Sequence, residues 1–134
     1  MIVADTNLIS YLLIEGEKTE LARKAWARDS DWAMPPLWKS EFLSVLVVAV
    51  RAGALDQEQA QLLWRRSRVF TNAIEIEPDG EQVLKIAVER GISAYDAQFV
   101  AAATELGVQL VTADKRILSR CPDLATSLEA FTDA

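Results

Sequence analysis

The chain has 134 residues, the length of one domain, and an ordinary globular composition with 51% apolar and 25% charged residues. Its net charge of −6 argues against binding to nucleic acid through overall charge alone, and its single cysteine excludes an internal disulfide. Histidine is absent, which excludes a Ser–His or Cys–His catalytic pair and a His-ligated zinc site. A metal held by these side chains must be held mainly by oxygen, which favours Mg²⁺ or Mn²⁺.

The sequence also gives no sign of export or of membrane insertion. No basic segment precedes an apolar run at the start, and the longest apolar stretch, 42–50, is far shorter than the roughly 20 residues of a membrane span. We therefore expect a single cytoplasmic domain over residues 1–134, with no membrane segment.

Short apolar runs alternate with helical patterns along the chain. The first half is predicted to contain strand 2–4, a short helix that Thr6 or Asn7 caps and that ends at Leu13, helix 19–28, strand 32–34 and helix 37–51. The second half is predicted to contain helix 56–70, strand 74–76, helix 79–91, helix 93–107, strand 108–111, a short helix opened by Asp114 and an edge strand at 127–128. This alternation predicts an α/β fold of three layers, with a mostly parallel sheet covered by helices on both faces.

Ligands of such sheets bind outside the carboxyl ends of the strands, and acidic residues follow two of the predicted strands. Asp5 directly follows strand 2–4, and Asp114 lies just beyond strand 108–111. Asp96 lies in the first turn of a helix with an apolar body, three residues after Ser93. Each of these acids, taken singly, is also explained as part of a helix cap.

Glu41 is harder to explain as a structural residue. It lies on an apolar stripe of helix 37–51, with Leu37 one turn before it and Val45 one turn after it. An unpaired ionised carboxylate is costly in such surroundings, and Lys39 lies on another side of the helix. Glu41 must therefore be protonated, bound to a cation, or paired with an arginine from elsewhere in the fold.

The predicted fold brings these four acids towards one edge of the sheet. Closely packed carboxylates repel one another, and a divalent cation makes such a cluster favourable. Metal-assisted hydrolysis of a phosphodiester is the chemistry that this donor set suits. Because the chain has no histidine to act as a general base, a water activated by the metal is the expected nucleophile.

Four stretches of this sequence resemble the motifs of PIN domains, and more narrowly those of VapC-type toxins of toxin–antitoxin pairs. They are Val3-Ala-Asp5-Thr-Asn7, Ser40-Glu41-Phe-Leu, Ser93-Ala-Tyr-Asp96-Ala and Leu110-Val-Thr112-Ala-Asp114-Lys. Their order and the intervals between the acids suit the family, and the similarity covers nearly the whole chain.

The resemblance implies a magnesium- or manganese-dependent endoribonuclease, the toxin of a type II toxin–antitoxin system. It implies Asp5, Glu41, Asp96 and Asp114 as catalytic, metal-binding acids, held by hydrogen bonds from Asn7, Ser93 and Thr112. RNA is the implied substrate, and a homodimer and a cognate antitoxin protein are the implied partners. Lys115 and Arg116 adjoin the site and are candidates for contact with RNA.

Two other interpretations stay open. A phosphoaspartyl protein would use Asp5 as its nucleophile, but its second acid is missing, because Asn7 occupies that position. A catalytically silent PIN-like interaction module is the other, and the complete set of acids argues against it.

Other conspicuous residues have structural interpretations. The arginines at 65, 66 and 68 are expected on a solvated helix face, the four tryptophans in packing, and Cys121 in the core.

Overall fold

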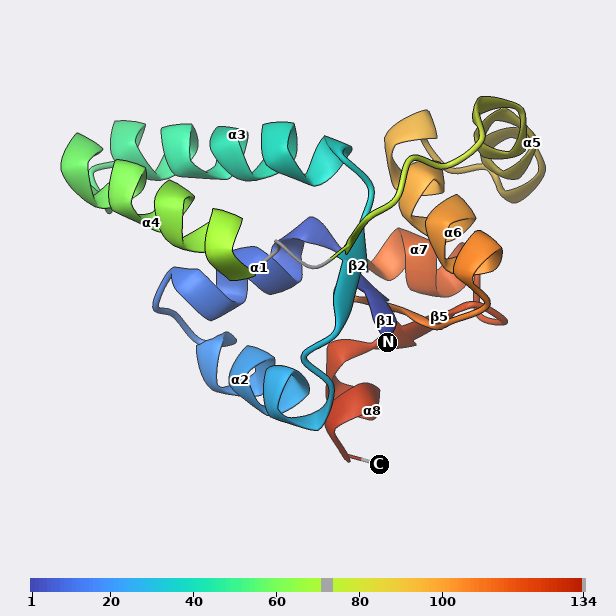
Figure 1. Ribbon diagram of the computed structural model, residues 1–134, viewed down its shortest axis with the longest axis horizontal. Helices are drawn as coiled ribbons and strands as arrows, with labels where there is room; N and C mark the ends of the chain where they lie inside the picture. The colour runs from blue at the N-terminus through green and yellow to red at the C-terminus, as the bar shows by residue number, and fades with distance from the viewer. Residues whose placement is uncertain (71–73, 134) are drawn as a thin grey trace.

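Short parallel strands form the centre of the computed structural model, which describes residues 1–70 and 74–133 (Figure 1). Within these residues the sheet has five strands in the order β3-β2-β1-β4-β5. The strands are β1 (Ile2–Ala4), β2 (Trp32–Met34), β3 (Ile74–Glu75), β4 (Leu110–Thr112) and β5 (Ala125–Ser127). Val3 of β1 is paired with Ala33 on one side and with Leu110 on the other. The predicted parallel sheet is confirmed.

Helices cover both faces of this sheet. They are α1 (Thr6–Leu13), α2 (Thr19–Arg28), α3 (Leu37–Arg51), α4 (Gln57–Phe70), α5 (Gly80–Arg90), α6 (Ala94–Leu106), α7 (Lys115–Arg120) and α8 (Leu128–Asp133). In Figure 1, α1 to α4 lie on one side of the strands, and α5, α6 and α7 lie on the other. Right-handed crossovers require this arrangement, because the strand order runs outwards from β1 to β3 and then continues from β4 on the opposite side of β1.

The reversal of strand order places a switch point between β1 and β4. In parallel α/β sheets, ligands bind in the crevice outside the carboxyl ends of the strands at such a point. The chain leaves β1 at Asp5 and leaves β4 towards Asp114. Both acids therefore lie at the position where the topology favours a site.

Apolar side chains fill the space between the sheet and the helices. Trp32, Trp38, Phe42 and Phe99 are the largest of the fully buried side chains. Each large apolar side chain that is fully buried contributes roughly 1.5–3 kcal/mol to folding. This core fixes α3 and α6, which carry Glu41 and Asp96.

Several predicted boundaries are wrong by one or two residues. The strand expected at 108–111 begins at Leu110, because Val108 N–H still donates to Ala103 O (3.1 Å) beyond the end of α6. The strand expected at 74–76 ends at Glu75. Helix α1 begins at Thr6, so neither Thr6 nor Asn7 is its cap; Asp5 occupies the cap position.

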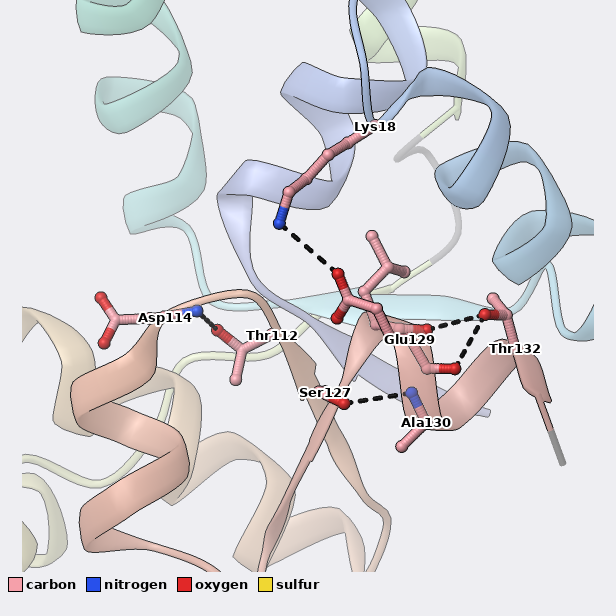
Figure 2. Close-up of polar contacts among 8 residues, drawn as sticks. Lys18, Thr112, Asp114, Ser127, Glu129, Ala130 and Thr132 are labelled. Carbon is pink, nitrogen blue, oxygen red and sulfur yellow. Dashed lines mark hydrogen bonds and ion pairs between the residues drawn. The ribbon is translucent and has the colours of Figure 1, made fainter.

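The end of the chain differs most from expectation. The strand expected at 127–128 is β5 (Ala125–Ser127), and Leu128 begins helix α8, which the sequence did not predict. The Ser127 hydroxyl accepts a hydrogen bond from Ala130 N–H (3.0 Å), as Figure 2 shows. Figure 2 also shows an ion pair from Lys18 to Glu129 of α8, with Nζ and Oε1 3.6 Å apart. A side-chain cap therefore turns the residues after β5 into a helix.

Helix α3 is apolar nearly all round without being buried all round. Phe42 and Leu46 are buried, whereas Val47 and Val48 are exposed. Glu41 lies between these two sides and is half-buried. None of the helices in the described part of the chain combines the length and the hydropathy that a membrane span needs.

Candidate active site

The four predicted acids line one cavity of about 480 Å³ at the carboxyl ends of the strands, here called the acid cavity. Asp5 follows β1, Glu41 lies in the second turn of α3, Asp96 lies in the first turn of α6, and Asp114 follows β4. Side chains that are more than a hundred residues apart in the sequence therefore face the same space.

Asp5 is the most buried of the four acids, with 8% of the residue exposed. Thr112 Oγ1 donates to Asp5 Oδ2 over 2.6 Å. Burial raises the pKa of Asp5 to about 6, and repulsion from Glu41 and Asp96 adds to the rise, against the lowering effect of the Thr112 hydrogen bond. Asp5 is therefore costly to ionise without a nearby cation.

Glu41 accepts a hydrogen bond from Thr6 Oγ1, with a distance of 2.7 Å to Oε1. Burial raises the pKa of Glu41, the Thr6 hydroxyl opposes this rise, and the charge of Asp96 adds to it. Lys39 is bound elsewhere, to Glu75 at 2.8 Å, as its position on the helix predicts. Among the described residues no arginine forms an ion pair with Glu41. An arginine partner within these residues therefore does not offset the cost of burying the Glu41 carboxylate.

Asp96 lies close enough to the other three acids for their charges to interact. Ser93 Oγ caps α6 by accepting from Asp96 N–H (3.0 Å). Burial raises the pKa of Asp96, and repulsion from Asp114 adds to the rise. The positive charge of Arg116 opposes this rise.

Asp114 has a structural task as well as a place in the cavity. Its Oδ1 accepts from Arg116 N–H (2.8 Å) and Ile117 N–H (3.0 Å), which caps α7. Its own N–H donates to Thr112 Oγ1 over 3.0 Å (Figure 2). The capping interpretation therefore holds for Asp114, but not for Asp5, whose side chain makes no cap hydrogen bond.

The residues expected to hold the acids behave differently from one another. Thr112 links Asp5 to the Asp114 turn through a single hydroxyl. Ser93 caps α6, and Asn7 lines the cavity without a hydrogen bond to the four acids among the described residues. Thr6, which the sequence analysis missed, holds Glu41. The signal that could have found it is a hydroxyl residue directly after Asp5, at a helix start that faces the cavity.

The donor set fits a hard divalent cation. All four candidate ligands are carboxylates, and burial and mutual repulsion disfavour the ionised forms of three of them, a cost that a cation would remove. As placed, no three acids of the described chain converge closely enough to hold one ion together. Binding of one ion by three of them would thus need a change of side-chain conformation.

The cysteine, the tryptophans and the α4 arginines lie where their structural interpretations place them. Cys121, Trp32 and Trp38 are buried, and Trp26 packs against Trp32 with ring centres 5.0 Å apart. The arginines at 65, 66 and 68 are exposed on α4. Lys115 and Arg116, the candidates for contact with RNA, are exposed on α7.

Replacing Thr112 with Val is expected to lower the free energy of unfolding by about 1–3 kcal/mol at pH 7, because buried Asp5 Oδ2 loses its donor. The loss should shrink at pH 4, where Asp5 is protonated in the folded state. Urea unfolding at the two pH values measures it. Thr126→Val in β5 is the matched control, since no hydrogen bond joins its hydroxyl to the acid cavity among the described residues. Equal losses for the two variants at pH 7 would contradict the role of Thr112.

Comparison with known proteins identifies the family. The sequence matches the PIN domain family over residues 2–123, so the chain belongs to that family. It is 28% identical to Ribonuclease VapC3 of Pyrobaculum aerophilum in an alignment of 129 positions that covers 93% of this chain and 98% of the relative. Over a shorter stretch of 44 residues, 33% of each chain, it is 41% identical to Exonuclease VapC9 of the same organism.

Two solved structures have the same fold. The crystal structure of PAE2754 from Pyrobaculum aerophilum superposes with a TM-score of 0.80 at 23% identity, and the match covers 98% of this chain and 92% of that one. A toxin–antitoxin complex from Klebsiella pneumoniae superposes with a TM-score of 0.67 at 20% identity, over 96% and 98% of the two chains.

Proposed function

We propose that this PIN domain is a Mg²⁺- or Mn²⁺-dependent endoribonuclease that acts as the toxin of a type II toxin–antitoxin system. The observation that carries the proposal is the acid cavity, where buried Asp5 and three further carboxylates gather at the switch point of a parallel sheet. The similarity to Ribonuclease VapC3 over nearly the whole chain supports RNA as the substrate.

The candidate site residues have distinct tasks in this proposal. Asp5, Glu41, Asp96 and Asp114 hold the cation, while Thr112 and Thr6 fix the directions of Asp5 and Glu41. When bound, the cation stabilises charge on the phosphoryl oxygens and lowers the pKa of the attacking water. Arg116 and Lys115 neutralise phosphates of the bound strand, Ser93 fixes the helix start that carries Asp96, and Asn7 lines the cavity beside the acids.

Internal cleavage is the part of the proposal that needs its own test, because one relative is named an exonuclease. A closed circular RNA has no ends, so only an endonuclease opens it. We expect the protein to open the circle with Mg²⁺ or Mn²⁺ and to lose all activity in excess EDTA. Degradation of linear RNA alone would contradict internal cleavage, and activity that persists in EDTA would contradict the metal mechanism.

We further propose a homodimer and a cognate antitoxin as partners, with the protein acting in the cytoplasm. The toxin–antitoxin complex that shares the fold supports an antitoxin partner, and exposed apolar side chains on α3, namely Leu43, Val47 and Val48, offer a surface for association. Light scattering of the protein alone tests the dimer, with a monomer mass as the contradicting result.

Expression without a partner is expected to slow growth of the host, and Asp5→Asn is expected to relieve the effect, since the variant lacks the most buried acid of the cavity. Growth curves at matched protein abundance measure this. Equal growth of cells that express wild type and variant would contradict the toxin role. The nuclease activity would still be tested separately, by the cleavage assay on circular RNA.

A further inference from the structure

Tyr95 is the aromatic residue among those that line the acid cavity. It directly precedes Asp96 in α6, and 63% of it is exposed. A large aromatic ring in water is usually packed on a neighbour, yet Tyr95 has no hydrogen bond, ion pair or ring contact with the described residues. Its ring is therefore free to contact a ligand in the cavity.

The backbone that carries Tyr95 is firmly held. Ser93 caps the helix two residues earlier, and Ala97 and Phe99 anchor it in the core. The residues after them, 100–103, are also buried. The ring thus projects from a fixed helix start at a set place beside the acids, as a binding residue requires.

The same cavity has a second, mixed wall. Helix α3 contributes the apolar side chains of Leu37 and Val45 and the hydroxyl groups of Ser40 and Ser44. The lining thus offers an aromatic ring from α6, carboxylates from two strand ends and from α3 and α6, and small polar and apolar groups from α3. With the proposed cation bound to the carboxylates, a flat aromatic ligand that carries phosphate groups is complementary to this combination.

We propose that Tyr95 positions the substrate by stacking on an unpaired RNA base next to the phosphate that faces the acids. The inference rests on the proposed ribonuclease function and adds a residue that selects for unpaired RNA. Bases inside an RNA duplex are already stacked and cannot lie on a protein ring, whereas bases of single strands and loops can be turned outwards. Because every base has a π-face, this contact selects unpaired strands without fixing a sequence.

The first experiment compares Tyr95→Ala, Tyr95→Leu and Tyr95→Phe on a single-stranded RNA with saturating Mn²⁺. Loss of a base–aromatic stack is expected to lower kcat/KM about 5- to 150-fold in Tyr95→Ala. Tyr95→Phe keeps the ring and should stay close to wild type, and Tyr95→Leu keeps the bulk without the ring and should resemble Tyr95→Ala. Val88→Ala, at a site on α5 that is 74% exposed, is the control for trimming a surface side chain.

The second experiment places an abasic nucleotide in turn at each position that flanks the cleaved bond. At the position where Tyr95 stacks, removal of the base should lower wild-type kcat/KM to the level of Tyr95→Ala, and the variant should lose nothing more. If Tyr95→Ala matches wild type on intact RNA, or if its defect is the same with every abasic substrate, base stacking is overturned while the nuclease stands. If wild type cleaves no RNA at all, the proposed function fails and this inference fails with it.

Discussion

Replacing Asp5 with Asn is expected to abolish RNA cleavage and, in the absence of metal, to stabilise the folded protein at neutral pH. Cleavage is lost because the cavity loses its most buried anionic oxygen ligand. Stability rises because Asn removes a charge that burial and repulsion disfavour, and its carbonyl oxygen can still accept from Thr112. A residue that served only the fold would give the opposite effect on stability.

The sign of the pH dependence follows from the raised pKa of Asp5. A group whose pKa is higher in the folded state stabilises fully below its unfolded value, here 3.8, and this contribution is lost as pH rises through the folded value of about 6. Relative to Asp5→Asn, wild type should therefore lose about 2 kcal/mol of unfolding free energy between about pH 4 and pH 7. Urea unfolding in EDTA across this range measures the difference. A difference between the two proteins that does not change with pH would contradict the raised pKa.

Glu41→Gln should abolish cleavage and stabilise the metal-free protein in the same direction. Gln keeps the shape and can accept from Thr6 Oγ1, while the charge that burial and Asp96 disfavour is removed. The pKa of Glu41 is raised, so its contribution to stability is lost as pH rises from mildly acidic towards neutral. At neutral pH and without metal, the variant should therefore be the more stable protein.

Manganese should reverse this order. A ligand at about 100 times its dissociation constant adds roughly 2.7 kcal/mol to the folded state, which wild type gains and the variant, one ligand short, largely does not. Unfolding of both proteins in EDTA and in saturating Mn²⁺ gives the four values needed. Glu58→Gln on the exposed surface of α4 is the control for loss of one negative charge and should respond to Mn²⁺ as wild type does. If Mn²⁺ stabilises wild type and Glu41→Gln equally, Glu41 is not a metal ligand.

The sequence predicts that the four acids lie at one edge of the sheet, and the structure shows them lining one cavity. The sequence does not predict which of the acids also caps a helix through its side chain. Asp5 and Asp114 each follow a buried strand and precede a helix, and the same capping interpretation applies to both. The difference arises from Thr112, whose hydroxyl donates to Asp5 across 107 positions of the chain while it accepts from the Asp114 backbone. No local pattern encodes that contact, because it depends on β1 and β4 being neighbours.

Local chemistry also explains the boundaries that were wrong. The apolar run that begins at Val108 predicts a strand, but a hydrogen bond to the end of α6 holds its first residue outside the sheet. Residues 127–128 suit a strand by composition, yet the Ser127 cap commits the chain to α8. Glu41 shows the reverse case. The apolar residues around it predict a perturbed carboxylate. The structure leaves Glu41 half-buried although one side of α3 is exposed, and this burial raises its pKa.

The central claim is that the four acids together form the binding site of a divalent cation. Anomalous diffraction from a crystal soaked in Mn²⁺ at neutral pH tests this claim most directly. The account predicts an anomalous peak in the acid cavity, at the coordination distance of about 2 Å from oxygens of Asp5 and at least one further acid. Because no three acids among the described residues converge on one point as placed, the soaked crystal should also show the acids drawn inwards. A cavity without a peak at saturating Mn²⁺, or a peak that Asp5 does not contact, would contradict the account.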